Sequence, residues 1–343
     1  MVCSAQGAHA AEYFDRYGLI PDSPALDLGV QPLGYPSGVI STVIRHDRIL
    51  QQSLAKLGQP LTTHAFRRGA DMVALLGERR LEAGLLGDMP TILAASTGSV
   101  LIVGLVKQTS TAIVAKGETR VAGLRGKRMG YIELSSAHYT LLQGLASAGL
   151  QAGEVKFVPL QIDEMPDALE RGDIDAFAGW EPAPSIALKK DVRNHIVFRG
   201  QSSDYFVIES TFATRNPEAA RVLVAGFLRA IEWLRRSQQI LEKAAAWALA
   251  EGAAFSGRLP SSSASQIAAI TRREILDIPS APAIVFSTGA TPLKSEFQFL
   301  SKLGKISPGA RWEKLENAFS YDGLARVMAD PGKYQIRAYD YAD

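Results

Sequence analysis

Cysteine is almost absent from the chain. The single cysteine, Cys3, lies near the N-terminus of 343 residues. One cysteine allows no internal disulfide and no thiolate metal cluster, and we expect no buried cysteine nucleophile. This scarcity suits an oxidising compartment. Zinc-ligand spacing is also missing from the five histidines, which are scattered along the chain: His9, His46, His64, His138 and His195.

The chain also lacks a strong net charge and a long apolar run. Lys plus Arg total 37 and Asp plus Glu total 35, so the formal net charge of +2 provides no global field to attract nucleic acid or an anionic membrane. The best candidate for a membrane span, residues 91–106, is interrupted by polar residues and glycines. With 47% hydrophobic residues, the chain has the composition of a globular protein with two cores of ordinary domain size.

The first twelve residues are small or polar and allow two interpretations. Ala8-His9-Ala10 has the small-x-small form of a signal-peptidase site, but no apolar core precedes it. The segment is either the remnant of a signal peptide or a polar N-terminal tail, and the sequence leaves both open.

Two distant segments repeat one pattern: residues 74–90 (ALLGERRLEAGLLGDMP) and 168–182 (ALERGDIDAFAGWEP). In each, a helical run ends at a glycine, where we expect a left-handed turn, and an apolar strand then stops at an acid beside a proline. Such acids mark the carboxyl edge of a sheet, where open α/β proteins bind ligands. Two such edges predict two α/β lobes that face each other across a small-molecule cleft.

The remaining pattern is α/β, with strands and helices in alternation. This βαβα order predicts a largely parallel sheet, and the last segment, 307–343, lacks a clear period and predicts an irregular tail. Strands are expected at 26–30, 61–66, 100–105, 111–115, 128–132, 155–160, 196–198 and 205–208. Helices are expected from near residue 39, at 71–77, from 217 to about 250, at 266–276 and at 295–303.

Several short motifs between residues 26 and 306 resemble one family, the periplasmic substrate-binding proteins of sulfonate, taurine and nitrate ABC importers. The resemblance is strongest to the taurine and alkanesulfonate branch. The motifs that carry it are Gly87-Asp88-Met89-Pro90, Gly126-Lys127-Arg128, Ser135-Ser136-Ala137-His138-Tyr139, Gly172-Asp173-Ile174-Asp175-Ala176, Trp180-Glu181-Pro182 and residues 297–305.

This resemblance implies the type II periplasmic-binding-protein fold, in which two α/β lobes are joined by a two-strand hinge with the ligand cleft between them. Lobe one would then combine residues 25–115 with 210–343, and lobe two would comprise 116–209. Residues 1–24 would be an N-terminal tail or signal remnant. Hinge closure around a ligand is the expected motion.

The resemblance also places a candidate anion site where a helix begins, at Ser135, Ser136, Ala137 and His138. Amides and hydroxyls at a helix N-terminus hold an oxyanion without a buried counter-ion. The alternative is plain N-capping by one of the serines, with His138 as a packed or capping side chain. Family members often carry a third hydroxyl where this chain has Ala137, which leaves the identity of the anion open.

In lobe one, further expected ligand contacts follow the first strand and open the facing helix. The resemblance places Gln31, Tyr35 and Pro36 along the cleft, where Tyr35 is equally suited to an ordinary turn. Arg68 beside Gly69 is positioned for a bidentate grip on an oxyanion, and a solvated basic turn is the alternative. The acid-Pro turn adds two more candidates, Asp88 and Met89.

The opposite end of the ligand is expected at Trp180, Glu181 and Asp204. In taurine-binding relatives an acid aligned near Asp204 meets the amine, whereas a solvated loop aspartate is the alternative reading. Trp180 is positioned to stack on the ligand, although a tryptophan at a strand end is commonly a core residue.

The resemblance therefore implies an extracytoplasmic receptor that delivers a small sulfonate, taurine or sulfate ester to an ABC permease. We expect no cofactor, metal or nucleic acid, a monomer, a periplasmic or extracytoplasmic location, and membrane association only through the permease. Enzymes share the fold, including a desulfinase with a cysteine nucleophile and a thiamine-pyrimidine synthase. Because residues 31–36 contain no cysteine, binding is the simpler reading. A ligand-sensing domain is the third alternative.

Overall fold

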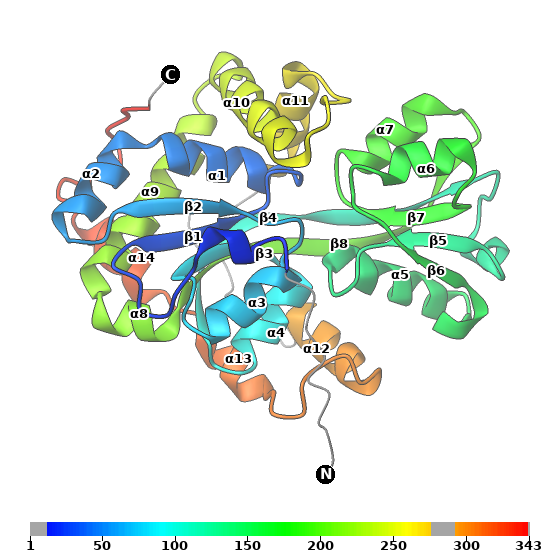
Figure 1. The fold of residues 1–343 in the computed structure, drawn as a ribbon, viewed down its shortest axis with the longest axis horizontal. Coiled ribbons are helices and arrows are strands. Elements are labelled where there is room, and N and C mark those ends of the chain that lie inside the picture. The colour runs from blue at the N-terminus through cyan, green and yellow to red at the C-terminus, as the bar shows by residue number, and fades with distance from the viewer. Residues whose placement is uncertain (1–11, 276–291, 342–343) are drawn as a thin grey trace, which may run out of the picture.

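A computed structural model describes residues 12–275 and 292–341. Its centre is one eight-stranded sheet with the order β2-β1-β3-β8-β4-β7-β5-β6 (Figure 1). The strands are β1 (Leu26–Val30), β2 (Leu61–Ala65), β3 (Ala83–Gly87), β4 (Val100–Lys116), β5 (Arg128–Tyr131), β6 (Lys156–Pro159), β7 (Ala176–Gly179) and β8 (Asn194–Glu209).

Two long strands, β4 and β8, run through the middle of the sheet and link its two ends. The sequence predicted four short strands here because the polar residues 107–110 and 199–204 interrupt the apolar runs. The structure corrects this, since the ladder between β4 and β8 continues through the polar residues, with Lys107 opposite Asp204. The expectation of a largely parallel sheet is also corrected. Each end is parallel, but β8 is antiparallel to both β3 and β4, and β4 is antiparallel to β7.

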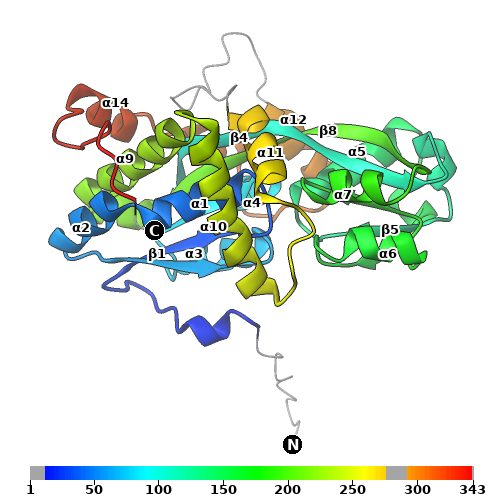
Figure 2. The same cartoon turned by 90° about the horizontal axis from the view of Figure 1, so that it is seen from above.

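Helices cover both faces of the sheet (Figure 2). At the β2-β1-β3 end, α1, α2, α9 and α10 pack on one face and α3 and α4 on the other. The helices are α1 (Ser37–His46), α2 (Arg48–Lys56), α3 (Ala70–Gly77), α4 (Asp88–Ala95), α5 (Ser136–Ser147), α6 (Met165–Arg171), α7 (Ala183–Lys190), α8 (Ser210–Arg215), α9 (Pro217–Leu234), α10 (Gln238–Ser256), α11 (Ala264–Ile275), α12 (Pro292–Lys302), α13 (Trp312–Ala318) and α14 (Asp322–Ala329), with short 3-10 turns η1 (Asp15–Tyr17), η2 (Val121–Leu124) and η3 (Ala152–Glu154).

The β7-β5-β6 end has its own two cores. One lies between the sheet and α5, and the other between the sheet and α6 with α7. Burial of apolar side chains on both faces is the main stabilising term for each end. None of the helices in the described ranges has both the length and the apolar content that crossing a bilayer requires.

The two copies of the repeated pattern differ at the helix end. Gly172 takes the left-handed conformation with φ 78°, as expected for a C-cap glycine. Gly77 does not, because it is the last residue of α3, and the left-handed residue is Arg79 with φ 58°. The expected turn at Gly77 is therefore wrong by two residues. Nothing in the sequence distinguishes an arginine with a left-handed backbone from an arginine in a helix, so the position of this turn could not be predicted.

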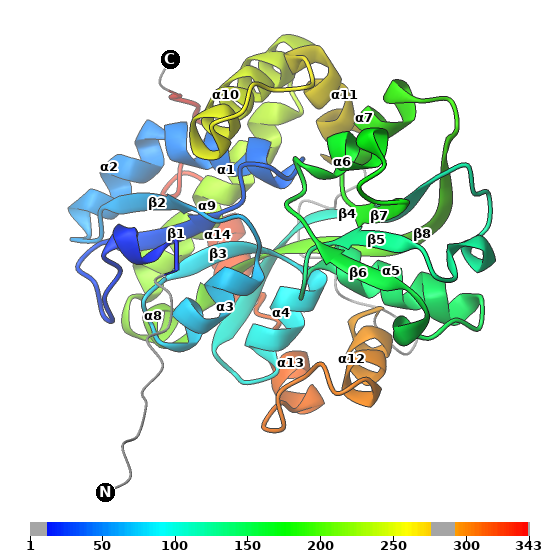
Figure 3. The same cartoon turned by 45° about the vertical axis from the view of Figure 1, so that its right-hand side comes forward.

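The C-terminal segment is more ordered than the irregular tail predicted from its sequence. It forms α13 and α14, and α12 and α13 both lie beside α4 (Figure 3). Arg229 holds the following segment, since Nη1 donates to the backbone oxygen of Tyr334 at 2.8 Å and Nε donates to Asp47 at 2.8 Å. The segment is thus tied to α2 and α9 by a buried guanidinium.

The described part of the N-terminal segment also packs against the domain. Tyr13 donates its hydroxyl to Asp71 at 2.8 Å, and Tyr17 donates to the backbone oxygen of Ala65 at 2.5 Å. Cys3, the small-x-small motif at 8–10 and the last residue of the helix expected at 266–276 lie outside the described residues.

Candidate functional site

The polar midpoint of β4 and β8 forms one wall of a buried cavity of about 30 Å³, here called the inner cleft. The carboxyl ends of β1 and β3 form a second wall, and the first turn of α5 forms a third. Its lining residues are Gln31, Gly34, Ser37, Gly69, Gly87, Pro90, Lys107, Thr111, Ser135, Ser136, Trp180, Ser202 and Asp204.

The N-terminus of α5 points its first turn at the inner cleft. Ser135 is the N-cap: its Oγ accepts a hydrogen bond from the amide of His138 at 3.2 Å and donates to the backbone oxygen of Ile132 at 2.7 Å. The amides at the start of a helix have no intrahelical acceptor, and the helix dipole makes this end electropositive. N-capping and anion binding are therefore compatible at Ser135, because its backbone and its hydroxyl have different tasks.

Ser136 joins α5 to the acid-Pro turn. Its side chain hydrogen-bonds Asp88, and its Oγ packs so closely on Gly87 that a Cβ at residue 87 would overlap it. Asp88 is 3% exposed and accepts hydrogen bonds from the amides of Met89 and Ser203 at 2.8 and 3.2 Å. Burial raises the pKa of Asp88 to about 6 against these hydrogen bonds. Asp88 thus lies behind the inner cleft and positions Ser136.

Lys107 brings a positive charge to the inner cleft. The residue is 4% exposed, and its Nζ lies 3.6 Å from Oδ1 of Asp204, its neighbour across the β4–β8 ladder. That distance exceeds a hydrogen bond, so the ammonium group keeps hydrogens for another acceptor. Ser37, at the start of α1, donates its hydroxyl to the other oxygen of Asp204. The inner cleft therefore contains one cation and one anion side by side.

The β2-β1-β3 end contributes a side-chain amide and a close backbone approach. Gln31 follows β1 and donates Nε2 to the backbone oxygen of Leu85 at 3.0 Å. Gly69 precedes α3 and lies against Pro90, where a Cβ on Gly69 would come within 2.7 Å of Cγ. Only glycine allows this approach, so the start of α3 packs tightly against the first turn of α4.

Trp180 closes the inner cleft from the β7-β5-β6 end. Its indole rests on Gly34, where a Cβ would lie 3.0 Å from Nε1. Next to it the amide of Tyr35 donates to the backbone oxygen of Glu181 at 3.4 Å. This seam joins the two ends of the sheet directly. Tyr35, with its buried ring, and Pro36, which precedes α1, belong to the seam and not to the inner-cleft lining.

The carboxylate of Glu181 turns away to local partners. It accepts from the amide of Ser185 at 3.3 Å and lies 3.9 Å from Nη2 of Arg273 on α11. Glu181 therefore supports the start of α7 and contacts α11, and it is not among the residues that line the inner cleft.

Besides Tyr35, Pro36, Asp88 and Glu181, four more predicted site residues lie outside the lining. Arg68 pairs with Asp71 at 2.5 Å within the same turn and is part exposed. Met89 and Ala137 are buried in the cores beside α4 and α5. The structure therefore places Arg68, Met89, Ala137 and His138 outside the lining of the inner cleft.

His138 is a packed, neutral histidine. Its Nδ1 accepts a hydrogen bond from the amide of Leu134 at 3.2 Å, which requires the hydrogen to be on Nε2. The rings of Tyr131 and Phe157 pack edge-on against it, and burial with the nearby Lys305 lowers the pKa of His138 to about 4. This arrangement fixes the first turn of α5.

Sequence reasoning brought six residues to the inner cleft: Gln31, Gly69, Ser135, Ser136, Trp180 and Asp204. It missed Lys107, because this lysine opens the polar segment 107–110 between two apolar runs and does not stand out from its neighbours in the sequence. The other residues missed are Gly34, Ser37, Gly87, Pro90, Thr111 and Ser202.

Comparison with known proteins identifies the family of the chain. The model of the NMT1-like family matches residues 21–250. The taurine-binding periplasmic protein of Escherichia coli (strain K12) is 29% identical over 213 residues, which cover 57% of this chain and 66% of that protein, slightly less than two thirds of its length.

Solved structures share the fold. The alkanesulfonate-binding protein SsuA from Xanthomonas axonopodis pv. citri, bound to MOPS, superposes with a TM-score of 0.64 at 21% identity, covering 88% of this chain and 99% of that one. The periplasmic aliphatic sulphonate binding protein SsuA from Escherichia coli superposes with a TM-score of 0.65 at 20% identity, covering 87% and 92%.

Proposed function

The chain belongs to the NMT1-like family, and we propose that it is an extracytoplasmic receptor that captures a small organic sulfonate and delivers it to an ABC importer. The names of its relatives, which bind taurine and sulfonates, support this class of ligand. They also favour binding over catalysis. The permease, the monomeric state and the extracytoplasmic location are parts of the same proposal.

The observation that carries the proposal is the composition of the inner cleft. The first turn of α5 and the free hydrogens of Lys107 approach one buried space from different elements. A sulfonate stays ionised at every physiological pH, and its three oxygens accept hydrogen bonds from these donors. Asp204 beside Lys107 gives the opposite charge, so a zwitterion such as taurine fits the same space, with its ammonium group at Asp204.

We propose that the two ends of the molecule move as lobes, with residues 25–115 and 210–343 in lobe one and 116–209 in lobe two. Strands β4 and β8 cross between them, and the inner cleft lies at this crossing. Closure of the lobes then brings Ser136 of lobe two against Asp88 and Gly87 of lobe one.

Thermal unfolding against a ligand panel tests the proposal. The panel contains taurine, methanesulfonate, MOPS, an aryl sulfonate, a sulfate ester, nitrate and a neutral sulfone. A ligand that binds only the folded protein raises the unfolding midpoint, and we expect this for at least one sulfonate and not for the neutral sulfone. A shift with taurine that disappears in Asp204→Asn identifies the ammonium contact. No shift with any anion would contradict the proposal.

A further inference from the structure

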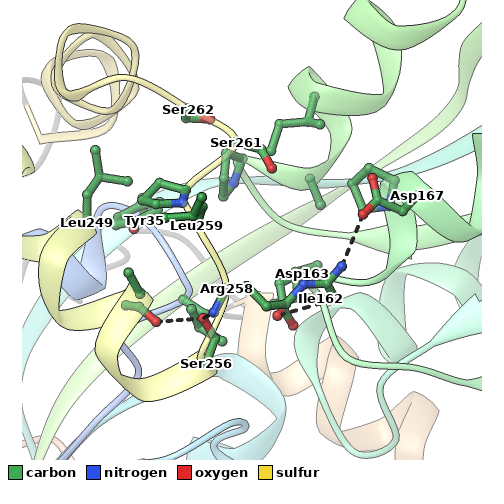
Figure 4. Close-up of a pocket in the computed structure, with 18 residues that line it drawn as sticks. Tyr35, Ile162, Asp163, Asp167, Leu249, Ser256, Arg258, Leu259, Ser261 and Ser262 are labelled. Carbon is green, nitrogen blue, oxygen red and sulfur yellow. Dashed lines mark hydrogen bonds and ion pairs between the residues drawn. The ribbon is translucent and has the colours of Figure 1, made fainter.

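A second cavity, here called the outer pocket, lies beyond the seam at Tyr35 and has a volume of about 390 Å³ (Figure 4). This volume is within the range of small-molecule sites. The inner cleft, at about 30 Å³, has room for an anionic head group and a few further atoms. A ligand with an organic body larger than a few atoms must therefore extend out of the inner cleft.

The partition between the two cavities is one residue thick. Gly34 lines the inner cleft and its neighbour Tyr35 lines the outer pocket, while Trp180 lines the inner cleft and Pro182 lines the outer pocket. The indole of Trp180 on Gly34, and one backbone hydrogen bond of 3.4 Å from Tyr35 to Glu181, separate them. The buried ring of Tyr35 lies on the outer-pocket side of this partition, so a path between the cavities requires the indole of Trp180 to turn away from Gly34.

The walls of the outer pocket are mainly apolar and come from both ends of the sheet. Leu33 and Leu249 belong to one end, and Ile162, Pro166 and Ile186 belong to the other. At the rim, Leu259 is 91% exposed, so a large apolar side chain stays in water at the mouth of the pocket. An apolar body in this space removes such surface from water, which is favourable in proportion to the area buried.

The charged groups at the outer pocket carry no net positive charge. Arg258 lies 3.1 Å from Asp167 and 3.8 Å from Asp163, as Figure 4 shows, and the two acids outnumber the one arginine in the lining. The pocket therefore offers no surplus positive charge for a second anionic group. Its chemistry suits an uncharged organic substituent.

We propose that the outer pocket holds the organic substituent of a ligand whose sulfonate head lies in the inner cleft, and that it selects sulfonates with a ring-sized apolar body over those without one. This inference rests on the proposed function. Such a ligand displaces the indole of Trp180 from Gly34 and contacts both lobes, so its binding also favours the closed state.

The test fills the outer pocket without touching the inner cleft. Ala253 on α10 lines the outer pocket, and its neighbour Ala254 is exposed, so Ala253→Phe and Ala254→Phe form a matched pair. Calorimetry measures naphthalenesulfonate and methanesulfonate with each variant. We expect Ala253→Phe to weaken naphthalenesulfonate by at least about tenfold and to leave methanesulfonate within about twofold, and Ala254→Phe to change neither.

The possible results distinguish a failure of this inference from a failure of the proposed function. If methanesulfonate binds and Ala253→Phe leaves the affinity for naphthalenesulfonate unchanged, the proposed role of the outer pocket is wrong and the proposed function stands. Absence of binding of both probes to the unmodified chain contradicts the proposed function, and this inference with it. Ser261→Trp, which fills the outer pocket from an exposed loop position, replaces Ala253→Phe if that variant does not fold, with the same expected results.

Discussion

Burial determines the charge and the task of the single residues around the inner cleft. Asp88 is almost fully buried, accepts two amide hydrogen bonds, and still has its pKa raised to about 6. Lys107 is almost as buried but keeps an acidic neighbour, Asp204. Asp88 therefore acts as a support for Ser136, and Lys107 is the charge that we propose for the ligand contact.

Asp88 makes stability depend on pH in a defined direction. Its folded pKa of about 6 exceeds the ordinary value of 3.8, so the folded state binds more protons than the unfolded state between these values. Its contribution to stability is fully present below about pH 4 and is lost as the pH rises through about 6. We expect Asp88→Asn to remove this fall, which amounts to at most about 3 kcal/mol.

Urea unfolding of the unmodified chain and of Asp88→Asn, measured at intervals from about pH 4 to pH 7, provides the comparison. Glu316→Gln, at an exposed position of α13, is the control and should keep the original pH profile. Parallel profiles for the unmodified chain and Asp88→Asn would show that Asp88 does not titrate as the structure implies.

At the residue scale, the sequence predicted the parts of the site that have a local signature. The serines before α5 and the acid near residue 204 are visible as a capping motif and an isolated charge. Lys107 has no such signature, because a lysine in a strand is read as an edge or surface residue until the strand's partners are known. Only the β4–β8 register places it opposite Asp204 and inside the cavity.

Among the elements, α5 depends on its first turn for both stability and the proposed site. The Ser135 hydroxyl accepts from the amide of His138, so Ser135→Ala leaves that amide without its acceptor. We expect a loss of about 1 kcal/mol in unfolding free energy, measured by urea denaturation. Ser147→Ala, at the other end of α5, keeps the N-cap and should change stability by less than half as much. Equal effects in the two variants would contradict the capping role.

The C-terminal elements depend on one buried ion pair. Arg229 and Asp47 are 1% and 0% exposed and lie 2.8 Å apart, and burial raises the pKa of Asp47 despite the arginine. Arg229→Met leaves Asp47 as an uncompensated buried charge, so we expect about 3–5 kcal/mol of destabilisation by urea unfolding. Arg326→Met removes an exposed ion pair on α14 and should cost less than about 1 kcal/mol. A small effect at Arg229 would mean that the pair does not hold the segment.

Element boundaries were predictable where a local rule applies and not where the rule depends on distant partners. Strand β1 begins and ends at the predicted residues, because this short run is bounded on both sides by proline-containing turn segments. The helices α13 and α14 were missed because each is only seven or eight residues long, too short to be stable alone, and their stability comes from docking on α4 and α9. Strands β4 and β8 were each divided into two because only their pairing with each other shows that the polar residues continue the ladder.

For the whole molecule, the proposed lobe motion depends on the contacts between the two ends of the sheet. Arg258, after α10, reaches Asp163 and Asp167 across the cleft, but all three side chains are partly exposed. Exposed ion pairs contribute little, so we expect Arg258→Ala to lower ligand affinity by no more than about fivefold, through a larger open population. Calorimetry with small-angle X-ray scattering of the ligand-free protein measures both effects.

Arg171→Ala is the control for this change, because Arg171 pairs with Asp173 within lobe two. It should leave affinity and the radius of gyration unchanged. If Arg258→Ala and Arg171→Ala have the same affinity and the same radius, the contact of Arg258 with lobe two does not influence closure.

The fold of the whole molecule was the most predictable feature. The repeated helix, strand and acid-Pro pattern predicted the α/β class, and the comparisons confirm the family resemblance on which the fold class was based. The outer pocket was not predictable, because its walls come from segments near residues 33, 162, 186 and 259 that only the fold brings together.

The central claim is that a sulfonate binds in the inner cleft, at the first turn of α5 and Lys107. The most direct test is calorimetry with the panel sulfonate that stabilises the protein most, using the unmodified chain, Lys107→Met and Arg68→Ala. We expect Lys107→Met to lose about 1.5–3 kcal/mol of binding free energy, and Arg68→Ala, whose guanidinium pairs with Asp71 outside the cleft, to bind as the unmodified chain does. Equal affinity in the unmodified chain and Lys107→Met, or a loss confined to Arg68→Ala, would contradict the account.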